Sequence, residues 1–104
     1  MRVLDFDVNN QKITKSPKCD FSGLVVGSSG FLYARFNFSQ EWTGYLKVAV
    51  FSCKSGEYPA KVQAGICEIP AEVLAEDSFK VSVVGKRGDS RLPCNRVTVI
   101  QRRY

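Results

Sequence analysis

The sequence of 104 residues contains no histidine, the side chain that most often acts as a general base near neutral pH. A serine or cysteine nucleophile would need a lysine or a carboxylate beside it, and no spacing in the chain suggests such a pair. Asp5 and Asp7 share one face of a predicted strand, and two solvated acids explain them more simply than the paired carboxylates of a glycosidase. We therefore predict no catalytic residues and no enzymatic activity.

Cysteine is sparse and scattered. The four cysteines (Cys19, Cys53, Cys67 and Cys94) include no Cys-x-x-Cys pair, so a zinc site would need ligands from four distant points of the chain. Disulfides lack the support of a secretion signal. We predict buried free thiols, no metal site and no cofactor.

Long hydrophobic runs are also missing. No run approaches the roughly 18 apolar residues of a membrane-spanning helix, and Asp5 and Asp7 interrupt the N-terminal segment before the apolar region of a signal peptide could form. We expect a protein that is made in the cytoplasm and has no membrane partner.

Acidic residues are nearly absent from the last quarter of the chain. Residues 1–79 carry eight Lys/Arg against nine Asp/Glu, whereas residues 80–104 carry seven against Asp89 alone. Such an asymmetry is typical of proteins with an acidic or nucleic-acid partner, although basic residues also protect exposed strand edges. Aromatic residues are not interleaved with these charges, so we do not expect nucleic acid to be the partner. The candidate interaction patch consists of Lys86, Arg87, Arg91, Arg96, Arg102, Arg103 and Tyr104.

Two short motifs have simple structural explanations. The segment Gly85–Asp89 lacks the spacing of a phosphate-binding loop, and its Arg-Gly-Asp tripeptide is explained by a β-turn with Gly88 at a positive φ. The glycosylation sequon that begins at Asn37 falls inside a predicted strand, so we interpret it as accidental.

Alternation of apolar and polar residues is the main structural pattern of the chain. It is clearest at residues 3–8, 31–39, 45–51, 79–84 and 96–101, and shorter extended segments are predicted at 11–14, 24–26 and 57–63. Pro70 and the helix formers behind it predict one short helical turn near residues 70–76. Together these elements predict a single domain over residues 1–104. We expect an all-β, antiparallel, immunoglobulin-like β-sandwich of seven or eight short strands.

The segment from Trp42 to Cys53 is the predicted centre of this fold. Residues 45–51 are apolar on both faces, which is typical of a central strand, and Trp42 lies just before them. Gly44 permits a close backbone approach beside the indole. The predicted core anchors are Trp42, Phe36, Phe38 and Phe51.

The order of these motifs resembles a known family. The matching pattern runs through Leu4-x-Phe6-x-Val8-x-x-Gln11-x-Ile13, Phe36-x-Phe38, Trp42-x-Gly44, Lys47-x-Ala49-x-Phe51, Cys67-x-Ile69-Pro70-x-Glu72-Val73-Leu74, Phe79-x-Val81-x-Val83-x-Gly85 and Asn95-x-Val97-x-Val99. It is similar to the small β-rich domain of structural proteins of tailed bacteriophages and prophages of Gram-positive bacteria, which is often found in baseplate, tail-fibre or accessory proteins.

The resemblance implies a virion building block without catalytic activity, which docks to other phage proteins and forms a symmetric oligomer. An alternative hypothesis is a small phage-encoded inhibitor, which would use the basic C-terminal region against a host defence protein or a nucleic-acid-associated protein. The two hypotheses differ in the expected partner and in the salt dependence of binding.

Overall fold

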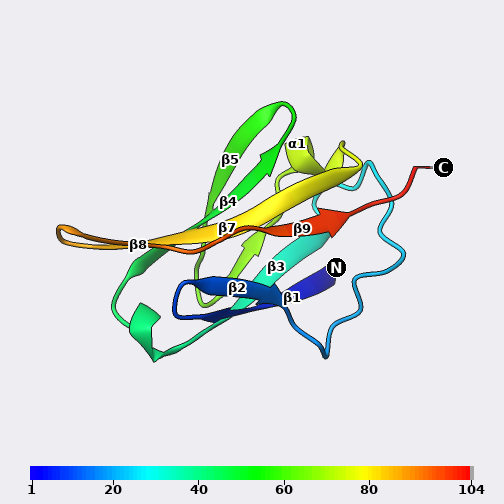
Figure 1. The fold of residues 1–104 in the computed structure, drawn as a ribbon. Coiled ribbons are helices and arrows are strands. Elements are labelled where there is room, and N and C mark those ends of the chain that lie inside the picture. Colours follow the sequence, from blue (N-terminus) through cyan, green and yellow to red (C-terminus); the bar gives the residue numbers. More distant parts are fainter. Residues whose placement is uncertain (104) are drawn as a thin grey trace.

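A computed structural model describes residues 1–103, and it contains two β-sheets whose apolar faces share one core (Figure 1). The strands are β1 (Arg2–Asn9), β2 (Lys12–Lys15), β3 (Leu32–Phe38), β4 (Leu46–Cys53), β5 (Gly56–Lys61), β6 (Ile66–Glu68), β7 (Ser78–Arg87), β8 (Ser90–Pro93) and β9 (Val97–Ile100). A 3-10 turn, η1 (Gln40–Trp42), precedes β4, and a short helix, α1 (Ala71–Leu74), precedes β7. The predicted all-β class and the helical turn after Pro70 are thus confirmed.

The first sheet has the strand order β2-β1-β3-β6, and one of its pairings was not predicted. β1 runs parallel to β3, in register from the pair Arg2 and Leu32 to the pair Val8 and Phe38, whereas the other strand pairs among residues 1–103 are antiparallel as predicted. Parallel neighbours need a long crossover between them. Here β2 and the irregular segment 16–31 provide it, returning the chain to the end at which β1 began.

The second sheet is antiparallel throughout, with the order β5-β4-β7 and two short strands along the far edge of β7. β8 pairs with the C-terminal half of β7 and β9 with its N-terminal half. β4 is therefore a central strand, as its apolar pattern predicted. Pro59 lies on the edge strand β5, where the missing N–H group of proline is tolerated.

Two details of the strand assignment differ from the prediction. Among residues 1–103 the structure has nine strands rather than seven or eight. Residues 24–26, however, form only a single bridge from Val25 to Arg102. Gly23 and Gly27 have φ angles of 72° and 105°, and these left-handed conformations end the extended run on both sides.

The core is formed by the inward residues of both sheets. Trp42 and Phe51 are fully buried, Phe36 is 3% exposed, and Phe38 is partly buried against the cluster. The aromatic rings of Phe36, Phe38 and Trp42 follow one another, with centroids 5.8 and 5.2 Å apart. This row of rings continues from the first sheet to the turn that leads into the second.

Trp42 contacts elements of both sheets. Its Nε1–H donates a 2.7 Å hydrogen bond to the carbonyl oxygen of Asn10, in the turn between β1 and β2. Its ring lies against Gly85 of β7, where an added Cβ would come within 3.0 Å of a ring carbon. The residue thus buries a large apolar surface and satisfies its one polar group at the same time.

We expect Trp42→Ala to lower the free energy of unfolding by about 3–5 kcal/mol, because the indole is removed from a site that is closed on all sides. Urea denaturation measures the change. Leu46→Ala is the matched control, since Leu46 is 79% exposed and its truncation should have little effect. Equal unfolding midpoints for Trp42→Ala and the original protein would show that the indole contributes no packing energy.

Gly85→Ala should cost about 1–3 kcal/mol by overpacking, since the new methyl group would meet the Trp42 ring and the Cβ of Tyr45. In the Trp42→Ala background much of this conflict disappears. A double-mutant cycle should therefore give a coupling energy of at least about 0.5 kcal/mol. Additive effects of the two substitutions would contradict the contact between Gly85 and the indole.

Candidate functional site

The hairpin of β7 and β8 projects beyond the rest of the second sheet, at the end of the molecule opposite to the C-terminus (Figure 1). Gly88 has a φ of 57°, which confirms the turn predicted for this position. Lys86 lies directly opposite Arg91, and Arg87 lies opposite Ser90. The hairpin therefore brings together three cations of the predicted patch.

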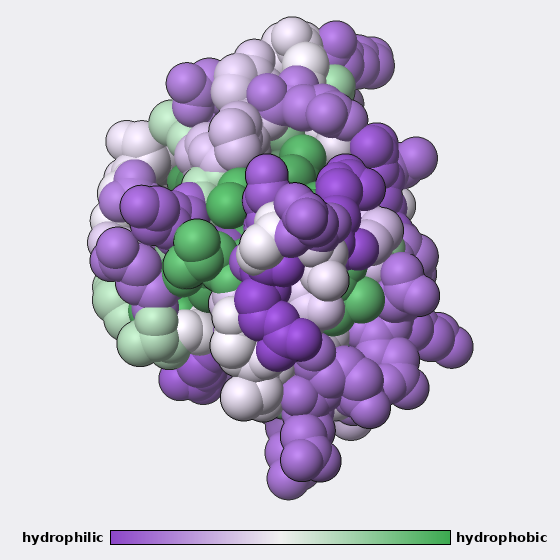
Figure 2. Space-filling model, turned by 90° about the vertical axis from the view of Figure 1, so that its left-hand side faces the viewer, coloured by the Kyte–Doolittle hydropathy of each residue, from purple (hydrophilic) through white to green (hydrophobic). Residues whose placement is uncertain are grey.

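An apolar residue and an aromatic ring lie at the base of this hairpin. Leu46 of β4 pairs with Lys86 and is 79% exposed. The guanidinium of Arg87 lies 5.0 Å from the centroid of the Tyr45 ring, a cation–π contact that orients the side chain. Figure 2 looks onto this end of the molecule and shows hydrophobic groups beside the hydrophilic side chains that point toward the viewer.

The other basic residues of the predicted patch lie elsewhere. Arg96 donates a 2.9 Å hydrogen bond to Glu57 in an ion pair, and Arg103 forms an ion pair with Asp77. Arg102 belongs to the bridge with Val25, near the C-terminal end of the described chain. Tyr104 lies outside the described residues. The structure thus distributes the basic residues over three places instead of the one surface that was expected.

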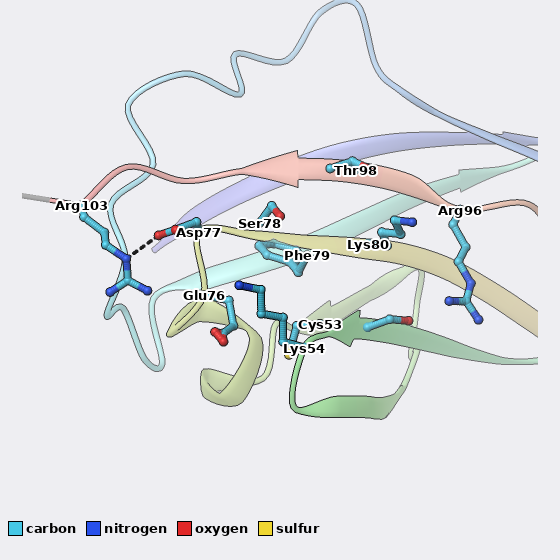
Figure 3. A pocket seen from close by; sticks show the side chains of 11 residues that line it. Cys53, Lys54, Glu76, Asp77, Ser78, Phe79, Lys80, Arg96, Thr98 and Arg103 are labelled. Carbon is cyan, nitrogen blue, oxygen red and sulfur yellow. Dashed lines mark hydrogen bonds and ion pairs between the residues drawn. The ribbon is translucent and has the colours of Figure 1, made fainter.

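A pocket that sequence reasoning missed lies at the other end of β7, with a volume of about 480 Å³ (Figure 3). Ser52, Lys80 and Thr98 lie side by side on β4, β7 and β9, because they are partners in the strand register. Figure 3 shows Arg96 and Arg103 at opposite ends of the pocket, with Lys54 and Lys80 between them. The alternation of β7 predicts that Lys80 points outward, but the sequence does not reveal which strands lie beside it.

The ion pair of Arg96 and Glu57 forms one border of this pocket. Glu57 is on the edge strand β5 and Arg96 precedes β9, so the pair reaches across the two strands between them. Beneath this outer layer Ser52 is only 9% exposed, and its Oγ is buried without a hydrogen-bond partner among residues 1–103. Buried hydroxyl groups in folded proteins are rarely left unpaired.

Asp5 and Asp7 do not form a carboxylate pair. Asp5 accepts two hydrogen bonds from Arg35, at 2.6 and 3.1 Å, and Asp7 accepts one from the Asn37 amide at 3.1 Å. The hydrogen bond to Asp5 raises the pKa of Arg35, because it favours the charged guanidinium. Both acids thus link β1 to β3.

Within residues 1–103, no three His, Cys, Asp or Glu side chains are grouped so that they could hold a metal ion. No helix in the same part of the chain is long and apolar enough to cross a membrane. Comparisons with protein-family models, with curated proteins and with solved structures found no match to this chain.

All four cysteines are free, and the prediction that they are buried holds only for Cys67. Burial raises the pKa of the Cys67 thiol to about 12. Burial also raises the pKa of Cys94, although the Val83 N–H group, which donates to its Sγ at 3.1 Å, acts in the opposite direction. Both pKa shifts favour the neutral thiol.

Cys67 should make the stability of the protein fall at alkaline pH. Its thiol ionises near pH 9 when unfolded but near 12 when folded, so its contribution is complete below pH 9 and is lost between pH 9 and 12. The slope is at most about 1.4 kcal/mol per pH unit. We expect Cys67→Ala to be less stable at pH 8 but to lose less stability between pH 8 and 10, as measured by urea denaturation. Parallel pH profiles would contradict the raised pKa.

Proposed function

We propose that this protein is a phage-encoded structural or assembly protein, which acts in the virion through protein–protein contacts as a tail, baseplate or accessory component. The resemblance to the phage domain supports the proposal. Most residues of the matching pattern belong to the core: Leu4, Phe6, Val8, Ile13, Phe36, Trp42, Ala49, Phe51, Cys67, Ile69, Val73, Leu74, Phe79, Val81, Val83 and Val99 are all buried. The matching pattern therefore consists mainly of core residues, so the residues that carry the function must be sought on the surface.

The observation that carries the proposal is the projecting hairpin of β7 and β8. It extends from a long sheet with a buried face, so its position is fixed by the core (Figure 1). At its base Leu46, Lys86 and Arg91 lie in one row across β4, β7 and β8, and Leu46 is exposed. An exposed apolar side chain next to cations suits a protein interface, in which arginine is enriched.

The hypothesis of an inhibitor uses the same residues in a different way. A surface for an acidic or nucleic-acid-bound target would need many cations in one place, whereas Arg96 and Arg103 are ion-paired away from the hairpin. Under the inhibitor hypothesis, the hairpin tip alone remains as a binding site for the target. Binding that weakens steeply with salt would favour this second function over the first.

We also propose that the two sheets form an immunoglobulin-like sandwich. The antiparallel second sheet and the shared core support this assignment, and the parallel pairing of β1 and β3 is the feature that departs from the expected pattern. A solved structure with two aligned, face-to-face sheets would agree with it, whereas orthogonal sheets would not.

We expect the purified protein to have a mass in light scattering that is a multiple of the chain mass, and to capture tail or baseplate proteins encoded beside its gene. Capture should fall by roughly tenfold in the variant Lys86→Glu with Arg91→Glu, because the cations at the hairpin base are reversed. The control is Lys12→Glu with Lys18→Glu, which reverses two exposed cations in the N-terminal part of the chain. A monomer that captures no virion protein would refute the proposal.

A further inference from the structure

We propose that the pocket between the turn after β4 and the start of β7 binds a carboxylate-bearing segment of a partner protein. This inference deepens the proposed function, on which it rests, because it names a second contact and its chemistry. The pocket is lined by four cations and three hydroxyl residues, together with two acids, Glu76 and Asp77. Its volume of about 480 Å³ is in the range of pockets that hold a small organic group rather than a single ion.

Two of the four cations are free to bind an anion. Lys54 and Lys80 are exposed and form no ion pair within residues 1–103, whereas Arg96 and Arg103 are each paired with an acid. Figure 3 shows both lysines between the two arginines, with Lys54 reaching up from the turn after β4. The Lys54 ammonium group points toward the Asp77 end of the pocket and that of Lys80 toward Arg96, so a segment with two carboxylates would meet one at each position.

The ion pairs at the borders of the pocket can exchange partners at low cost. The side chains of Arg96 and Glu57 are 50% and 57% exposed, and those of Arg103 and Asp77 are exposed to a similar degree. Solvated pairs of this kind contribute little to stability. An incoming carboxylate can therefore replace Glu57 or Asp77 without leaving a buried charge unpaired.

The Ser52 hydroxyl is the independent observation that points to a ligand. Ser52 lines the pocket next to Lys80, and its Oγ is buried without any hydrogen-bond partner in the described chain. A ligand that draws the covering side chains aside would give this hydroxyl an acceptor. Thr98, on the other side of Lys80, supplies a second hydroxyl in the same row.

The mixed charge of the lining favours a protein carboxylate over a phosphate group. Glu76 and Asp77 repel a multiply charged anion, but they can accept hydrogen bonds from the backbone N–H groups that accompany an acidic side chain. A peptide segment with one or two carboxylates matches both kinds of lining group. A free phosphate matches only the cations and hydroxyls.

The test is a titration followed by the amide signals in two-dimensional NMR. The probe is a capped pentapeptide in which glutamate and glycine alternate, and the comparison probes are the same peptide with glutamine and inorganic phosphate. We expect the glutamate peptide to shift the amide signals of Ser52, Lys54 and Lys80, and the glutamine peptide to leave them unchanged. Binding should become roughly tenfold weaker in Lys54→Gln with Lys80→Gln, but not in the control Lys12→Gln with Lys18→Gln.

Several outcomes would overturn the inference. Equal shifts with both peptides would remove the role of the carboxylate, and tighter binding of phosphate than of the peptide would identify a small-anion site instead. Capture of virion proteins separates this inference from the proposed function. If the original protein captures them and the Lys54 and Lys80 variant does so equally well, the pocket inference fails alone. If the original protein captures none while the peptide still binds, the proposed function fails alone.

Discussion

The fold depends on the position of one indole ring. Trp42 lies in the turn between β3 of the first sheet and β4 of the second, and its side chain contacts residues of both sheets. Its N–H group donates to the carbonyl oxygen of Asn10 in the turn between β1 and β2, while its ring fills the space above Gly85 of β7. A residue other than glycine at position 85 would push the ring outward, and a smaller side chain at position 42 would leave a cavity. The separation of the sheets at this end is therefore set by a single matched pair.

A second set of contacts, made of polar groups, lies next to Trp42, because it begins at Gln11, the residue after Asn10. The side-chain amide of Gln11 donates to the carbonyl oxygen of Pro93, and Asn95 Oδ1 accepts from the backbone N–H of Ile13. The Asn95 N–H in turn donates to the carbonyl oxygen of Gln11. These bonds connect β2 of the first sheet to the segment between β8 and β9 of the second. They also explain the shift from β8 to β9 along β7: Cys94 is still hydrogen-bonded to Val83 of β7, but Asn95 turns away to reach β2.

The local alternation of apolar and polar residues predicted the individual strands, but the path of the chain between them determines which strands become neighbours. Alternation at residues 31–39 and 79–84 predicted β3 and β7, and Pro70 predicted α1, because each depends on nearby residues. The parallel pairing of β1 and β3 depends on where residues 16–31 travel, which no local pattern describes. The pocket was missed for the same reason, since Ser52, Lys80 and Thr98 are distant in sequence and meet only through strand register. The basic residues were predicted to form one patch because they are close together in the sequence. In the structure they lie in separate places.

The distribution of the basic C-terminal residues gives β7 two different ends. One end carries Lys86 and Arg87 on the projecting hairpin, and the other borders the pocket that contains Lys80. Lys80 and Lys86 are six residues apart on β7, which at about 3.3 Å per residue separates them by roughly 20 Å. A small ligand cannot bridge this distance, so the hairpin and the pocket can be occupied independently. Because β7 is paired on both edges and buried on one face, it holds the two sites at a fixed separation.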